Sequence, residues 1–150
     1  MKILVLGASA RAVAQSAARA GHEPVAMDAF GDRDLKKIAS WRKLDKSAPL
    51  GEIASELNAD GAVFASGVEN RPEAIADLER VGVRVFSSPL ESVRRCRNLA
   101  ELEKFCAKNG FPRPKVFLPQ PGDDLSGFEG FLVKRFKSGS GIGVRVCSKS

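Results

Sequence analysis

The segment Lys2-Ile-Leu-Val-Leu6, followed by Gly7, places four apolar residues in a row near the start of the chain. A strand with one wet face alternates apolar and polar residues, whereas a central parallel strand is covered on both faces and is continuously apolar. The run is too short for a signal peptide and stops at a glycine followed by small residues. It therefore predicts the first buried strand of an α/β domain.

The sequence after this strand alternates between helical and strand patterns. We expect helices over Arg11–Ala20, Leu50–Leu57 and Pro72–Val81, and strands over Pro24–Asp28, Ala62–Ala65 and Val83–Phe86. Loops are expected over Phe30–Leu35 and around Trp41, and the side chain of Trp41 is expected to serve in packing. Alternation of this kind with short connections is typical of a doubly wound parallel sheet. The first part of the chain is thus predicted to be a Rossmann-like domain.

Three loops follow the carboxyl ends of predicted strands, where sheets of this class bind ligands. They are Gly7–Arg11, Asp28–Asp34 and Ser66–Arg71. Backbone N–H groups at a helix N-terminus favour a small anion near the first loop. The polar and glycine residues that we expect to bind substrate are Ser9, Arg11, Asp28, Gly67, Glu69 and Asn70.

The first loop invites comparison with the dinucleotide-binding fingerprint, because Asp28 follows it at about the expected distance. Only Gly7 of the three glycines is present, and Ser9 and Ala12 occupy the other two positions. A side chain at Ser9 would stand where the backbone must approach the pyrophosphate. NAD or FAD binding is therefore not expected.

The pattern changes after Pro89, and we place a domain boundary there, between residues 1–89 and residues 90–150. Helices are expected over Leu90–Arg97 and Leu99–Lys108, and the prolines of Phe111–Pro114 then favour extended chain.

A glycine-rich loop, Ser138-Gly-Ser-Gly-Ile-Gly143, lies between two apolar runs, with Lys134 upstream. Alternating glycines let backbone N–H groups approach an anion, and a lysine can supply a point charge for phosphate. In a Walker A loop the lysine ends the loop and a helix follows, which is not the pattern here. The sequence predicts a β-hairpin that covers a nucleotide, or else a plain flexible hairpin.

The net charge of +6 arises entirely after residue 75. The first 75 residues hold ten basic and ten acidic side chains, and the remaining residues hold fourteen basic and eight acidic side chains. Such a charge suits nucleic acid or a polyphosphate ligand. No basic–aromatic interleaving is present, so we expect no nucleic-acid partner.

A single histidine and three scattered cysteines leave no basis for a zinc site or a Ser-His-Asp triad. Unpaired cysteines and the lack of a membrane-length apolar run indicate a reduced, cytoplasmic protein, with Cys106 expected in a helix core.

The order of these parts resembles the front half of an ATP-grasp ligase. In that superfamily a Rossmann-like domain precedes an α+β lobe with a lysine-bearing strand and a glycine-rich hairpin over the ATP phosphates. Gly7–Arg11 and Ser66–Asn70 also resemble ATP-grasp carboligases of archaea and methylotrophic bacteria. The resemblance implies that ATP is bound by Lys134, Ser138, Gly139, Ser140, Gly141, Ile142 and Gly143, with Arg97 in place of a second lysine.

The resemblance further implies an ATP-dependent carboxylate–amine (or thiol) ligase acting through an acylphosphate, of which this chain is the N-terminal part. The substrate would be a small carboxylate, such as an amino acid or a precursor in cofactor biosynthesis, and a homodimer is possible. Magnesium would be bound by residues outside the chain, so the ATP-grasp lobe would be partial and inactive alone. The alternative is a non-catalytic α/β module that binds a small molecule or a protein.

Overall fold

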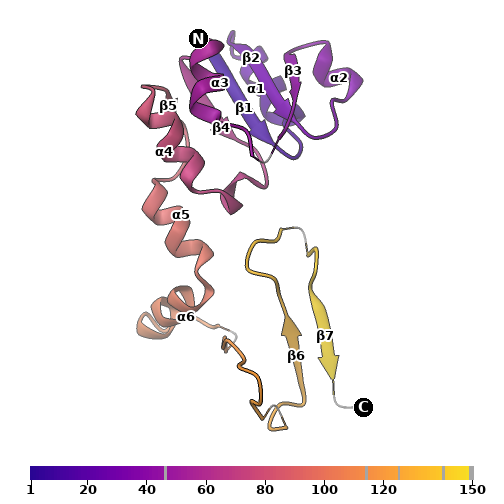
Figure 1. Cartoon of the computed structure of the whole chain (residues 1–150), viewed down its shortest axis with the longest axis vertical. Helices are drawn as coiled ribbons and strands as arrows, with labels where there is room; N and C mark the ends of the chain where they lie inside the picture. The colour runs from indigo at the N-terminus through magenta and orange to yellow at the C-terminus, as the bar shows by residue number, and fades with distance from the viewer. Residues whose placement is uncertain (46, 114, 125, 140, 149–150) are drawn as a thin grey trace. The chain divides into compact units, whose positions relative to one another are not determined.

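The structure is a computed structural model that describes residues 1–45, 47–113, 115–124, 126–139 and 141–148. The chain divides into two compact units, Met1–Val93 (unit 1) and Arg94–Ser150 (unit 2). Figure 1 shows the elements of both.

Unit 1 contains a parallel sheet which, within the described residues, has five strands in the order β3-β2-β1-β4-β5. The strands are β1 (Lys2–Gly7), β2 (Glu23–Asp28), β3 (Ser40–Lys43), β4 (Gly61–Phe64) and β5 (Arg84–Val85). The helices are α1 (Arg11–Arg19), α2 (Arg33–Lys36), α3 (Leu50–Glu56) and α4 (Glu73–Arg80), with a 3₁₀ turn over Val68–Asn70.

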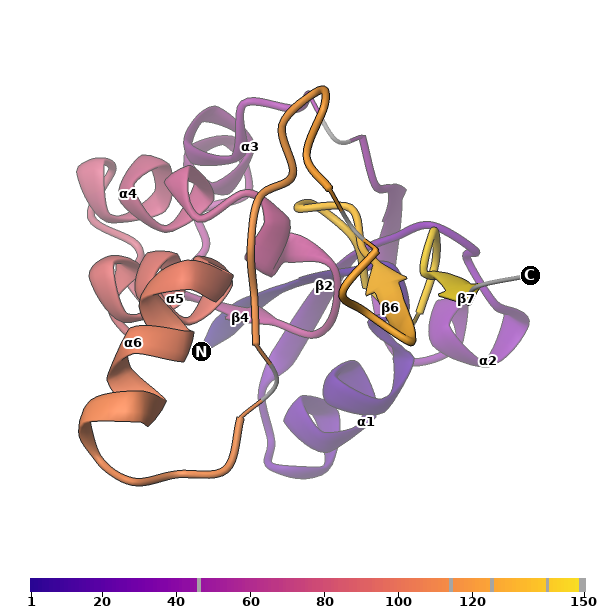
Figure 2. The same ribbon diagram turned by 90° about the horizontal axis from the view of Figure 1, so that it is seen from below.

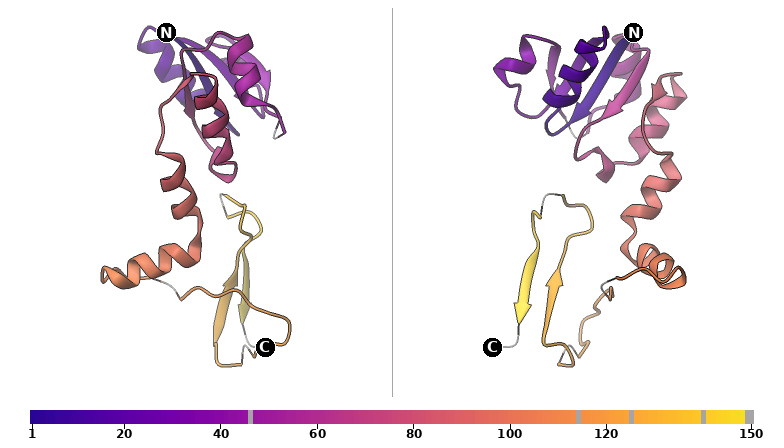
Figure 3. Two further views of the ribbon diagram at one scale, coloured as in Figure 1. Left: turned by 60° about the vertical axis from the view of Figure 1, so that its left-hand side comes forward. Right: turned by 180° about the vertical axis from the view of Figure 1, so that it is seen from behind.

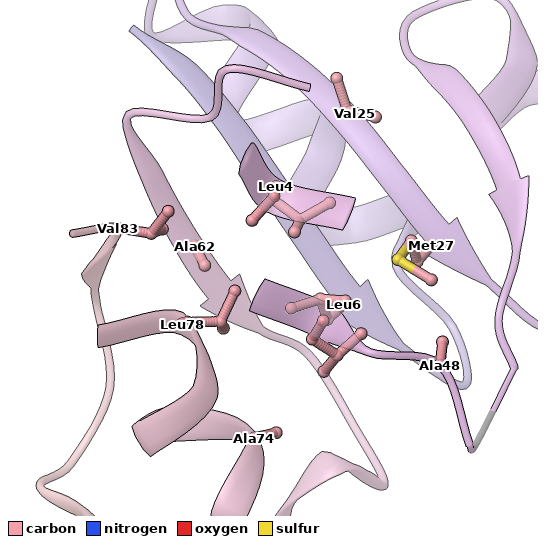
Figure 4. Packing of buried hydrophobic residues seen from close by; sticks show 11 residues of the cluster. Leu4, Leu6, Val25, Met27, Ala48, Ala62, Ala74, Leu78 and Val83 are labelled. Carbon is pink, nitrogen blue, oxygen red and sulfur yellow. The ribbon is translucent and has the colours of Figure 1, made fainter. Parts of the chain in front are cut away.

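The central strand β1 separates two apolar layers, as its uninterrupted apolar sequence predicts. Leu4 and Leu6 point to the face covered by α3 and α4, where they pack with Met27, Ala74 and Leu78 (Figure 4). Figure 2 shows these two helices on one side of the sheet and α1 and α2 on the other.

The opposite face is formed by the alternate residues of β1. Ile3 and Val5 pack there against Ala14 of α1 and Leu35 of α2. Small residues along α1 let this helix lie close to the strands. The predicted α/β fold class is confirmed.

The structure adds two elements that the sequence patterns did not indicate. Residues predicted as a loop, Phe30–Leu35, contain the start of the one-turn helix α2, and Trp41 lies in strand β3 instead of a loop. The predicted packing role of Trp41 is confirmed, because its half-buried ring lies against the core layer that contains Ile3 and Val5.

Unit 2 contains the antiparallel pair β6 (Gly130–Val133) and β7 (Arg145–Ser148), which confirms the predicted hairpin (Figure 3). Helix α5 (Leu90–Arg97) crosses the division between the units, and α6 (Leu99–Lys108) follows it. None of the described residues of unit 2 is buried. The core position expected for Cys106 is therefore wrong, since this side chain is only half-buried in a helix without a core.

Candidate functional site

The loops that follow β1, β2 and β4 are hydrogen-bonded to one another at the carboxyl edge of the sheet. The N–H of Ala8 donates to the carbonyl of Ser66 (2.8 Å), and the N–H of Ala29 donates to the carbonyl of Ala8 (3.3 Å). A Cβ at Gly7 would lie 2.6 Å from the backbone nitrogen of Ser66. The end of β1 must therefore be glycine, because the chain after β4 passes too close for any side chain.

Asp28 ends β2 and is completely buried, with an exposed fraction of 0%. Its Oδ2 accepts the N–H of Ala10 (2.7 Å), and its Oδ1 accepts those of Phe30 (2.7 Å) and Gly31 (2.6 Å). The carboxylate thus joins the loop before α1 to the loop before α2.

Burial raises the pKa of the Asp28 carboxyl, but other effects outweigh it and leave the pKa below its ordinary value. Backbone hydrogen bonds from Gly31, Ala10 and Phe30 favour the ionised form, and the positive charge of Arg11 adds to them. Asp28 is therefore an anion that supports the edge from inside, and its oxygens already have protein partners.

Ser9 and Arg11 lie on the exposed side of the same edge, at the start of α1. The N–H of Ser9 donates to Ser66 Oγ (3.3 Å). Arg11 Nη1 lies 3.6 Å from Asp32 Oδ2, so a carboxylate partly offsets its charge. The negative charges of Asp28 and Asp32 near this helix end lower the local positive potential.

The loop after β4 forms a small pocket with the end of β5. The pocket has a volume of about 230 Å³, and Glu69 lines it together with Phe64, Pro72, Ile75, Ser87 and Ser88. Its walls are mostly apolar, and Glu69 and the two serines provide polar groups. Gly67 and Asn70 belong to the same loop as Glu69; Gly67 has a φ of +81°, and its carbonyl accepts a hydrogen bond from Asn70 Nδ2 at 3.4 Å.

The residues predicted to bind ATP lie in unit 2, around the turn between β6 and β7. Lys134 directly follows β6 and is exposed. Gly141 and Gly143 have φ values of +75° and +77°, which favour glycine. Ile142 donates to the carbonyl of Gly139 (3.0 Å), and Ser140 lies outside the described residues.

Arg97 of α5 is joined to this turn. Its Nη2 donates to the carbonyl of Ser138 (2.8 Å) and lies 3.5 Å from that of Phe136. The Ser138 hydroxyl in turn donates to the carbonyl of Arg135 (3.0 Å). The structure therefore brings Arg97 next to the glycine-rich turn; the resemblance to ATP-grasp ligases had grouped the same residues.

No group of three or more His, Cys, Asp or Glu side chains that could hold a metal ion occurs in the described part of the chain. Among the helices of those same residues, none has the length and apolarity needed to cross a membrane.

No protein-family model and no curated protein sequence matches the chain. Solved structures do match. The N5-carboxyaminoimidazole ribonucleotide synthetase of Thermotoga maritima matches at 17% identity and a TM-score of 0.65, covering 99% of this chain and 41% of that one. Glycinamide-RNase-transformylase T of Mycobacterium tuberculosis matches at 18% identity and a TM-score of 0.70, over 100% of this chain and 44% of that one.

A third match is the biotin carboxylase domain dimer of the 2-oxoglutarate carboxylase of Hydrogenobacter thermophilus, in complex with MgADP, ADP and bicarbonate. It has 19% identity and a TM-score of 0.70, over 98% of this chain and 37% of that one. All three are ATP-grasp enzymes, matched over their N-terminal part. The chain has the fold of the N-terminal part of ATP-grasp enzymes. It spans about two-fifths of the length of these ATP-grasp structures.

Two features of the candidate site were missed by sequence reasoning. One is the contribution of Ser87 and Ser88 to the pocket with Glu69. A signal was present, since these serines directly follow the predicted last strand and so belong to the same ligand-binding edge. The other is the inward orientation of Asp28, which no local pattern indicates.

Proposed function

We propose that the chain is the N-terminal part of an ATP-dependent carboxylate–amine (or thiol) ligase. The observation that carries this proposal is the match of nearly the whole chain to the N-terminal part of ATP-grasp enzymes. The reaction would transfer the terminal phosphoryl group of ATP to a substrate carboxylate and release ADP. The amine or thiol then attacks the acylphosphate carbon, and inorganic phosphate leaves.

The glycine-rich turn is proposed to contact the ATP phosphates. Positive φ at Gly141 and Gly143 suits backbone N–H groups that must approach an anion closely. Lys134 supplies an exposed positive charge beside the turn. Arg97, whose Nη2 donates to the carbonyl of Ser138, is proposed to add its positive charge at the same turn. Magnesium ions would offset the phosphate charge, with protein ligands from outside this chain.

The carboxyl edge of unit 1 is proposed to hold the small substrate. Ser9 and Arg11 offer a hydroxyl and a guanidinium for a carboxylate, and Glu69 offers an anion for an amine. Gly67 and Asn70, in the loop that carries Glu69, are proposed to contact the substrate as well, whereas the buried Asp28 supports the loops from behind.

Unit 2 gives independent support for a longer protein. Leu132, Phe136, Ile142 and Val146 are 57–79% exposed, and a two-stranded hairpin alone is marginally stable. Further polypeptide that covers these side chains would complete the lobe.

The test is isothermal titration with Mg-ATP of the complete product of the reading frame that encodes this chain. We expect saturable binding that weakens by at least about tenfold in Lys134→Ala, because a phosphate loses a charge-assisted contact. Lys104→Ala is the matched control, since this exposed lysine lies on α6, away from the turn in sequence. Absence of binding, or equal affinity in Lys134→Ala, would contradict the proposal and favour a non-catalytic binding module.

A further inference from the structure

A groove lies in unit 1 beside the first residues of β2 and β3, and thus at the amino edge of the sheet. The strand-end loops proposed for the ligase substrate are at the opposite edge. The groove is shallow and open to solvent, with a volume of about 780 Å³. Its lining residues include Ala18, His22, Pro24, Lys36, Ile38 and Trp41.

One side of the groove is apolar and firmly held. Pro24 is buried, and Ile38 and Trp41 are half-buried against the core layer below. Trp41 Nε1 donates to the carbonyl of Asp28 (3.3 Å), and Gly31 approaches so closely that a Cβ there would lie 2.5 Å from the indole. The indole is therefore fixed in place, and a fixed aromatic face binds a second ring at little entropic cost.

The rim of the groove is positively charged. Lys36 Nζ lies 4.2 Å from the centre of the Trp41 ring, and in the described part of the chain it forms no ion pair. Lys37 Nζ lies 3.4 Å from Asp34 Oδ1. Glu23, a carboxylate on the rim, lies 3.6 Å from the ammonium of Lys2, which offsets its charge.

We infer that this groove binds a small planar aromatic anion, such as an aromatic carboxylate. The ring of the ligand stacks on Trp41, and its carboxylate pairs with the ammonium of Lys36. Lys36 must leave its position over the indole, which costs little because an exposed cation–π contact is weak. The competing explanation is that Lys36 only covers an otherwise exposed part of Trp41.

The test is a titration of the whole chain with benzoate, followed by fluorescence. Trp41 is the only tryptophan and the chain has no tyrosine, so the fluorescence reports on the surroundings of this one indole, and the Lys36 variant assigns the signal to the groove. We expect saturable quenching with a Kd of about 1–10 mM, as the atom count of benzoate allows. Neutral benzamide and ring-free acetate, at equal ionic strength, should bind at least about threefold more weakly.

Two variants separate a binding role of Lys36 from a covering role. Lys36→Gln should raise the Kd for benzoate about three- to fivefold, whereas Lys43→Gln on the same side of the sheet should leave it unchanged, since Lys43 does not line the groove. The chemical shift of the Trp41 Nε1–H provides a second readout that is independent of quenching. Non-saturating quenching, equal affinity for benzamide, or an unchanged Kd in Lys36→Gln would each overturn the inference. Because ATP takes no part, the result is independent of the ligase proposal.

Discussion

Asp28 shows how one carboxylate can define the edge of a sheet. Three backbone N–H groups, from two different loops, converge on its two oxygens in a site closed to solvent. Only an acceptor with no proton of its own can satisfy all three donors. If Asn replaced Asp28, its NH₂ group would face at least one of the backbone N–H groups, and that donor would lose its acceptor.

We predict that Asp28→Asn lowers the free energy of unfolding of unit 1 by about 2–3 kcal/mol, because a buried donor loses its acceptor. Urea unfolding followed by Trp41 fluorescence measures the change. Asp32→Asn is the matched control and should cost less than about 1 kcal/mol, since its pair with Arg11 is partly exposed and screened by solvent, at a distance of 3.6 Å. Equal losses in the free energy of unfolding for the two substitutions would show that the buried hydrogen bonds of Asp28 stabilise unit 1 no more than the Asp32–Arg11 pair does.

The lowered pKa of Asp28 predicts a pH dependence of stability. Because the folded-state pKa lies below the unfolded value of about 3.9, the contribution is fully present above that value. It is lost as the pH falls below about 4 and through the folded-state pKa. The difference in unfolding midpoint between the wild type and Asp28→Asn should therefore be constant from pH 5 to 7 and shrink below about pH 4. A difference that stays constant down to pH 2 would contradict this assignment.

Strand β3 is held at the sheet edge by contacts of Trp41 with the loop after β2. The indole lies against Gly31, which has a φ of +64°. A side chain at this position would meet the ring and would also require an unfavourable backbone conformation.

Gly31→Ala should therefore destabilise unit 1 by about 2–4 kcal/mol, from overpacking and backbone strain together, and shift the Trp41 emission to the red. Gly21→Ala is the control, because Gly21 has a φ of +78° but no atom within 4 Å of the added Cβ. It should cost about 1 kcal/mol without changing the emission. Equal costs would mean that Trp41 moves aside freely.

How far the sequence predicted each element depended on how completely its side chains are buried. β1 and its neighbours β2 and β4 pack against helices, so apolar runs identified them. Within the described residues β3 pairs with β2 alone, and it consists of Ser-Trp-Arg-Lys, so its strand character depends on pairing with a separate segment of the chain. In the one-turn helix α2, Leu35 is the buried residue, which is too little for a periodic signal.

The sequence likewise predicted part of the candidate site and missed the rest. The strand-end loops follow from topology alone, whereas the inward direction of Asp28 depends on how two loops meet. The pocket beside Glu69 also required the pairing of β4 with β5, which brings Ser87 and Ser88 near it.

At the scale of the molecule, the two units differ in the completeness of their cores. Unit 1 has two apolar layers around its sheet, and the described residues of unit 2 contain no buried side chain. Net stability requires enough buried apolar surface to offset the conformational entropy of the chain.

We predict that a fragment of residues 1–98, which retains the whole of α5, unfolds cooperatively with the same Trp41 emission as the full chain. A fragment of residues 99–150 should give the circular dichroism of a largely unfolded peptide and no cooperative thermal transition. A cooperative transition in the second fragment would contradict the view that unit 2 needs further polypeptide to fold.

The bonds that join the loops of unit 1 also affect amide-proton exchange. Loop amides usually exchange with deuterated solvent through small local openings. The N–H groups of Ala10 and Gly31 are instead bonded to the two oxygens of one buried anion, so opening either loop leaves that anion without one of its donors, at a cost in free energy. Their protons should therefore exchange as slowly as those of β1, in segments that connect helices and strands.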